Sequence, residues 1–126
     1  ITEFGTAAYR GAGDRGGRCM AIVAYDQDTG APLRLNGEYV RDEAGQASYL
    51  RELLEIFDAA GVDSAFVFLF ALDTFPHRPD GDPRDDLDLA SPGIVKVLEG
   101  RHGSTYPDMA WEPKAAFASL AECYRR

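Results

Sequence analysis

The stretch "QASYLRELLEIFDAAGVDSAFVFLFALD" (46–73) contains two different hydrophobic patterns, separated by a glycine. In its first half the apolar residues have the i, i+3, i+4, i+7 spacing of one helix face: Leu50, Leu53, Leu54 and Phe57. Asp42 is a suitable N-cap for this helix, and Gly61 is a suitable stop after its last turn. The sequence therefore predicts a helix over roughly residues 43–60.

The second half, "SAFVFLFAL" (64–72), is a continuous apolar run. The run is short, rich in aromatic residues and bounded by polar ones, which is typical of a strand buried on both faces in a helix-covered parallel sheet. Alternation along a strand places Phe66, Phe68 and Phe70 on one side. We expect the side chains between them on the other side, with both sides buried in the complete barrel.

The remaining segments alternate between short apolar runs and long polar connections. Residues 1–5 are expected to end a strand, 6–18 to form a loop rich in Gly and Arg, 19–26 to form a strand or a short helix, 28–32 a turn, 73–93 a long loop, 93–100 a short strand and 112–124 a helix. This βαβα order implies parallel strands with helical cover. Since two parallel strands make no stable sheet alone, we expect 1–126 to be a single partial domain of a larger protein.

Composition excludes several classes of function. The net charge of −8 and the pI of about 4.6 argue against nucleic-acid binding and against binding to anionic membranes. No apolar run is long enough to span a membrane, and no signal-peptide pattern is seen, so a cytoplasmic location is expected. Cys19 and Cys123 lack metal-ligand spacing. The sequence therefore implies neither a metal nor a cofactor.

Three segments in order resemble a known family. "ITEFG" (1–5) resembles the seventh-strand motif of clan A glycoside hydrolases, 46–73 resembles their helix seven and strand eight, and "YPDMAWEPKAAFASLAECY" (106–124) resembles their last loop and helix eight. A narrower resemblance, through "YRGAGDRGGR" (9–18), "YVRDEAGQ" (39–46) and "DDLDLAS" (85–91), is to bacterial proteins labelled abortive infection proteins. The resemblance implies an α/β fold: the C-terminal βαβα portion, strands seven and eight with their helices, of a TIM (β/α)8 barrel.

The resemblance also implies a function, the retaining hydrolysis of a glycosidic bond in the complete protein. Glu3 would be the nucleophile, at a strand end where barrel active sites collect. Retaining enzymes need a second carboxyl group about 5–5.5 Å away, and the upstream part of the same polypeptide would supply it. Phe70, Asp73 and His77 are the expected contacts of a carbohydrate or other small-molecule substrate. The alternative is a non-catalytic binding or phage-defence protein, in which Glu3 is an exposed or Arg-paired carboxylate.

Two further motifs are set aside. "GAGDRG" (11–16) matches a dinucleotide-binding pattern, but no convincing strand precedes it and no long helix follows, so we expect a flexible loop. The acidic residues of 80–88 suggest calcium, but the sixth and twelfth positions counted from Asp80 are Asp85 and Ser91, where an EF-hand needs Gly and Glu. Trp111 is expected to be a packing anchor.

Overall fold

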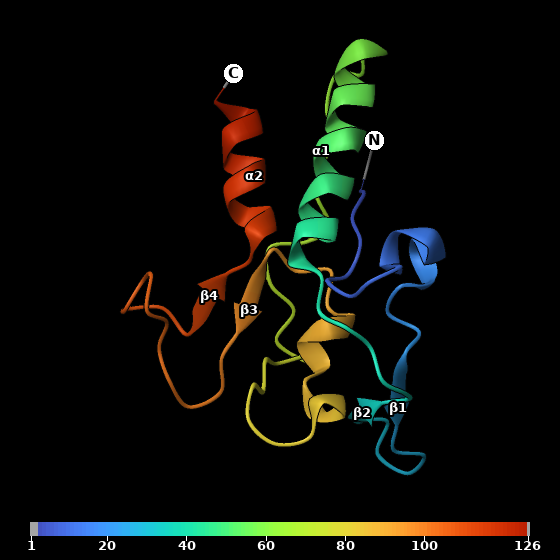
Figure 1. The fold of residues 1–126 in the computed structure, drawn as a ribbon, viewed down its shortest axis with the longest axis vertical. Helices are drawn as coiled ribbons and strands as arrows, with labels where there is room; N and C mark the ends of the chain where they lie inside the picture. The colour runs from blue at the N-terminus through green and yellow to red at the C-terminus, as the bar shows by residue number, and fades with distance from the viewer. Residues whose placement is uncertain (1–2, 126) are drawn as a thin grey trace.

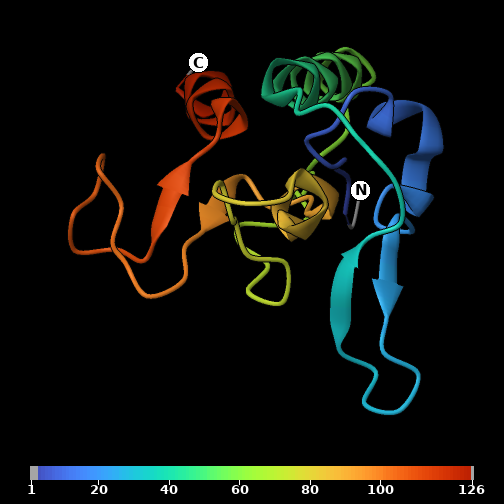
Figure 2. The same cartoon turned by 60° about the horizontal axis from the view of Figure 1, so that its bottom comes forward.

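The computed structural model describes residues 3–125 (Figure 1). Its two long helices, α1 (Glu43–Ala59) and α2 (Ala115–Tyr124), pack against each other at one end of the molecule. The strands form two antiparallel hairpins, β1 (Val23–Tyr25) with β2 (Pro32–Leu35) and β3 (Val95–Val97) with β4 (Trp111–Pro113). Three short 3-10 helices complete the described part: η1 (Ala12–Arg18), η2 (Pro83–Asp85) and η3 (Leu87–Ala90). Figure 2 shows the hairpins well separated on either side of η2 and η3.

The prediction that the chain forms the C-terminal βαβα portion of a TIM barrel is wrong. Both sheets within residues 3–125 are two-stranded and antiparallel, whereas barrel strands seven and eight would pair in parallel. Parallel pairing between the chain start and the 64–72 run is limited to one bridge, in which the Phe68 N–H donates to the Phe4 carbonyl at 2.7 Å. Further along the run, the carbonyls of Leu69 and Phe70 accept from the N–H of Ile94. Beyond Phe68 the run therefore pairs with a different segment and not with the chain start.

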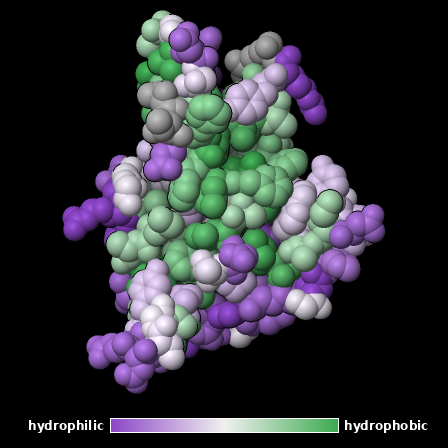
Figure 3. All heavy atoms as spheres, turned by 180° about the vertical axis from the view of Figure 1, so that it is seen from behind, coloured by the Kyte–Doolittle hydropathy of each residue, from purple (hydrophilic) through white to green (hydrophobic). Residues whose placement is uncertain are grey.

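The 64–72 run is not a doubly buried strand. Its side chains do alternate, since Ala65 and Val67 pack against the core while Phe66, Phe68 and Phe70 are 62%, 37% and 48% exposed. Burial of both sides was expected in a complete barrel. Within residues 3–125 the phenylalanine side is only partly covered, through the contacts of Phe70 with Trp111 of β4 and Phe117 of α2. Figure 3 shows apolar residues gathered over much of the face opposite the view of Figure 1.

The two predicted helices are present. Helix α1 has the expected N-cap, since the Asp42 carboxylate accepts from the Gly45 N–H at 2.9 Å. Helix α2 begins at Ala115 rather than at residue 112, because the residues before it pair with β3 as strand β4. The predicted strand at 93–100 contains β3, and 19–26 contains β1. The loop expected at 6–18 contains η1. None of the described helices has the length and apolar character needed to cross a bilayer.

Two buried apolar clusters hold these elements together. One lies around η3 and the β1–β2 hairpin and includes Ile22, Leu35, Phe75, Leu87 and Leu89; the other lies under α1 and α2 and includes Phe4, Leu50, Ile94, Val95 and Ala116. Gln46 of α1 is buried between them, and its amide donates to the carbonyls of Thr6 at 3.0 Å and Gly93 at 3.2 Å. This side chain therefore fixes α1 to two segments distant in sequence.

Candidate functional site

A pocket of about 340 Å³ lies beside Glu3. Its walls come from the chain start, from η1 and from α1, and they include the aromatic residues Tyr49 and Phe68. We call it the Glu3 pocket. An acid beside aromatic surface is suited to a small polar ligand with an apolar face.

Glycines shape this pocket at two places. A Cβ on Gly5 would collide with the carbonyl oxygen of Phe68, so only glycine allows the chain start to lie this close to the 66–68 backbone. Gly16 has a φ of 56° within η1, a conformation that favours glycine, and Gly16 and Gly17 both line the pocket. Glycine backbone therefore forms part of the wall beside Glu3.

The Glu3 carboxylate is exposed and makes no hydrogen bond or ion pair within residues 3–125. An unpaired carboxylate can act as a nucleophile or accept hydrogen bonds from ligand hydroxyl groups. No other acidic residue lines the pocket among the described residues. The second carboxyl group of a retaining pair is therefore not supplied by these walls.

The other expected substrate contacts lie elsewhere. Phe70 belongs to an aromatic group in which its ring centroid lies 5.2 Å from that of Trp111, edge to face. Trp111 also packs against Phe117 of α2, which fits the packing role expected for it. Asp73 is exposed and forms no hydrogen bond or ion pair with any described residue. Phe70, Asp73 and His77 all lie outside the lining of the Glu3 pocket.

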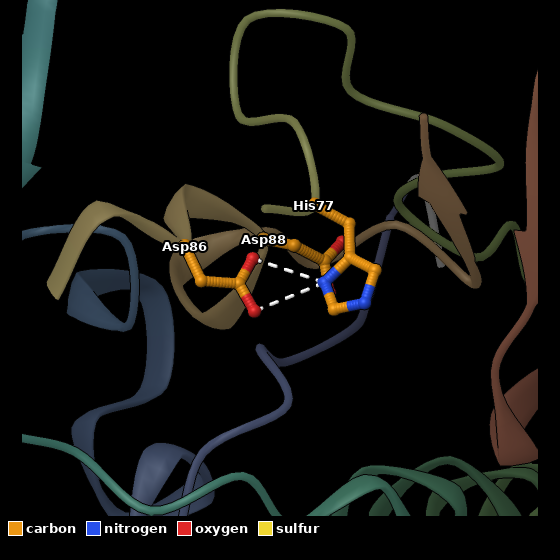
Figure 4. Close-up of side chains that lie close together, drawn as sticks. All are labelled: His77, Asp86 and Asp88. Carbon is orange, nitrogen blue, oxygen red and sulfur yellow. Dashed lines mark hydrogen bonds and ion pairs between the residues drawn. The ribbon is translucent and has the colours of Figure 1, made fainter. Parts of the chain in front are cut away.

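His77 joins a group of charged side chains. Its Nδ1 lies 2.9 and 3.1 Å from the two carboxylate oxygens of Asp86, which follows η2 (Figure 4). Arg41 Nη2 donates to Asp86 at 3.0 Å and to Asp88 at 2.9 Å. Lys114 Nζ lies 3.2 Å from the other Asp88 oxygen. Together with Glu43 and Lys96, whose side chains also pair at 3.2 Å, we call these residues the charged network.

Burial and pairing act in opposite directions on the network's pKa values. Burial raises the pKa of Asp86, but hydrogen bonds from His77 and from the Arg78 N–H outweigh it, so that pKa lies below its usual 3.8. Burial lowers the pKa of Arg41, yet Asp88 and Asp86 together raise it above its usual value. Burial also dominates at Lys114 and lowers its pKa despite Asp88. The pKa of each of these three side chains therefore depends on the charged residues that surround it in the network.

The Lys114–Asp88 contact is an ion pair rather than a hydrogen bond. The facing oxygen, Asp88 Oδ1, has no hydrogen-bond partner of acceptable geometry despite the 3.2 Å distance. Lys114 Nζ donates instead to the Ser91 carbonyl, also at 3.2 Å. Both side chains are buried, so attraction between the charges is what balances their loss of hydration.

Three side chains of the network could in principle ligate a metal ion. Single atoms of His77, Asp86 and Asp88 lie within 4.8 Å of one another. However, Arg41 Nη2 already lies 2.9–3.3 Å from an atom of each. A metal ion would have to displace this partly buried guanidinium. The arrangement therefore suits an arginine-centred ion cluster and not a resident metal.

Sequence reasoning identified His77 and noted the acidic residues of 80–88, but it missed Arg41 and Lys114. The partners of Arg41 are Asp86 and Asp88, which lie 45 and 47 residues away in the sequence. No local sequence pattern therefore indicates the contact. A partial signal exists in "DDLDLAS" (85–91), where acids alternate with leucines. Such alternation places an acid among buried apolar neighbours, where it needs a counter-charge.

Comparison with known proteins adds no assignment. No protein-family model matches the chain, and no curated protein matches it significantly. The functional argument therefore depends on the geometry of these sites and on the resemblance of the motifs.

Proposed function

We propose that the Glu3 pocket binds a carbohydrate and that Glu3 acts as the nucleophile in retaining hydrolysis of a glycosidic bond. The observation that carries the proposal is the unpaired Glu3 carboxylate in a pocket of about 340 Å³ whose lining includes aromatic residues. The resemblance of "ITEFG" to the nucleophile strand of clan A glycoside hydrolases supports the same role. Phe68 and Tyr49 would offer apolar surface to a sugar ring.

The chemistry requires one group that these walls do not provide. Glu3 would attack the anomeric carbon, forming a glycosyl ester as the bond to the leaving oxygen breaks, and water would then hydrolyse the ester with net retention. The leaving oxygen takes its proton from a general acid, which contributes about 10²–10⁴-fold to the rate. We propose that an upstream segment of the same polypeptide supplies this acid.

A second candidate is carbohydrate binding without catalysis, including a role in phage defence. It is favoured by the lack of a second acid among the described lining residues of the Glu3 pocket. The two candidates share the ligand and differ in whether Glu3 forms a bond to it.

The discriminating experiment uses 2-deoxy-2-fluoro glycosides of several sugars with dinitrophenolate as the leaving group. This leaving group departs without protonation, so labelling reports the nucleophile alone and does not need the missing acid. Mass spectrometry of peptides from the labelled chain locates the adduct. The same sugars are tested for non-covalent binding by NMR.

Labelling at Glu3, lost in Glu3→Gln and kept in Glu52→Gln, would support the hydrolase. Glu52 is a matched control because it is an exposed glutamate on α1, outside the Glu3 pocket. Binding of a sugar without labelling would favour the binding protein. An adduct on another carboxylate, or no interaction with any of the sugars, would reject both candidates.

A further inference from the structure

Both histidines of the chain line the same pocket. The sequence has two histidines, His77 and His102, and both contribute to a pocket of about 270 Å³ beside the β3–β4 hairpin. Lys96 and Arg101 also line this pocket, and Glu112 is its one acidic lining residue among the described residues. We call it the histidine pocket. It shares no lining residue with the Glu3 pocket.

His77 is held in place before any ligand arrives. Its backbone N–H donates to the Val97 carbonyl at 2.7 Å, and its Nδ1 is engaged by Asp86. The second ring nitrogen, Nε2, points away from Asp86 and Asp88 (Figure 4). A histidine whose Nδ1 is fixed by a carboxylate presents Nε2 in a defined direction. His77 can therefore offer Nε2 to a ligand without losing its contact with Asp86.

The acid in the pocket wall is already engaged. The Glu112 carboxylate accepts from the N–H groups of Ser104 at 2.8 Å and Thr105 at 3.0 Å, within the loop of the same hairpin. The Thr105 side chain, together with these backbone hydrogen bonds, holds the pKa of Glu112 below its usual value. Its charge thus orders the loop that carries Arg101 and His102.

The charge of this pocket opposes that of the whole chain. A chain of net charge −8 here gathers a lysine, an arginine and two imidazoles around one cavity. We propose that the histidine pocket binds the phosphoryl group of a small phosphorylated ligand. Arginine matches phosphate oxygens with paired donors, and Lys96, which also pairs with Glu43, adds a further positive charge beside the two imidazole rings. The volume of about 270 Å³ leaves room for a small organic group beside the phosphoryl group.

The test follows the two histidines by proton NMR in the full chain at constant pH and ionic strength. Each imidazole gives its own resolved Cε1 proton signal, and His102→Gln assigns the pair. Inorganic phosphate, glycerol 2-phosphate and acetate are titrated separately. We expect both signals to shift and saturate with phosphate and with glycerol 2-phosphate, and to respond at least tenfold more weakly to acetate. Tighter binding of glycerol 2-phosphate than of phosphate would identify a phosphate monoester as the ligand; the reverse order would identify the free ion.

The variant Arg101→Gln is expected to weaken phosphate binding about tenfold or more, as loss of a charge-assisted hydrogen bond predicts. Arg101 is exposed, so the variant should fold. Arg51→Gln on α1 removes the same charge outside the histidine pocket and is expected to leave binding unchanged. Unmoved histidine signals, equal affinity for acetate, or equal weakening by the two variants would overturn the proposal.

Discussion

Lys114 is a charged residue in an environment that disfavours charge. Its side chain is 0% exposed and that of its partner Asp88 is 1% exposed. Taking two such groups out of water costs several kcal/mol each, and attraction between them offsets the cost only while both are present. The pair therefore does more to determine how α2 joins η3 than to increase net stability.

Replacing Lys114 with methionine should lower the free energy of unfolding by about 3 kcal/mol, the low end of the effect for breaking a buried pair. The low end applies because Arg41 still contacts Asp88. Urea denaturation measures the loss. Adding Asp88→Asn to Lys114→Met should cost less than the sum of the two single changes, since no uncompensated carboxylate is then buried. Additive losses would show that the pair is not coupled.

Asp86 gives the molecule a defined sensitivity to acid. Its pKa is lower in the folded chain than its usual 3.8, so the unfolded chain takes up this proton first as the pH falls. The stabilisation is complete above the unfolded pKa of about 3.9 and is lost as the pH falls through the lower folded value. We expect Asp86→Asn to be less stable than the parent at pH 7, with a difference that shrinks below about pH 4. Urea titrations at several pH values test this, and a constant difference would contradict it.

At the scale of elements, the contact between residues 4–5 and 66–68 is the one that shapes the Glu3 pocket. Gly5→Ala would place a methyl group against the Phe68 carbonyl, which belongs to the backbone and cannot turn aside. We expect a loss of about 1–3 kcal/mol, typical of overpacking, together with faster amide exchange at Phe4 and Phe68. Denaturation and hydrogen exchange measure the two effects.

Gly17→Ala is the matched control. Gly17 lines the same pocket, but a Cβ there meets nothing within 4 Å. The change should leave both stability and exchange nearly unaltered. If the two alanine variants lost equal stability, the close approach at Gly5 would not be the cause.

The helices were predictable because their signals are local. Asp42 and the apolar face of α1 lie within the helix or next to it, so propensity, cap and periodicity all indicate the same element. The 64–72 run was misassigned because an apolar run does not say which backbone will pair with it. Val67 bridges Phe4, but the carbonyls further along the run bond to Ile94 in another segment. The charged network could not be predicted from the sequence for the same reason, since its residues come into contact only in the folded chain.

At the scale of the whole molecule, the exposed aromatic residues of the 64–72 run are the feature that bears on association. Phe66, Phe68 and Phe70 leave large apolar surface in contact with water, and such surface promotes association. We expect the chain to associate reversibly as its concentration rises. The double variant Phe66→Ser, Phe70→Ser should shift the sedimentation distribution towards the monomer.

The control for this experiment is Leu33→Ser. Leu33 is 51% exposed but lies on β2, in the β1–β2 hairpin, away from the 64–72 run. It should leave the distribution unchanged. A monomer at every concentration would contradict the role given to the phenylalanine side.

The charged network also constrains how this protein can change over evolutionary time. Arg41, Asp86, Asp88 and Lys114 come from three separate segments of the chain, and each neutralises at least one of the others. A lineage that lost Lys114 alone would leave the buried Asp88 with Arg41 as its one cationic partner among the described residues, so we expect these positions to change by paired replacements. We expect descendants of a common ancestor to keep all four or to exchange them together. These four residues would then identify distant homologues whose other residues no longer resemble those of this chain.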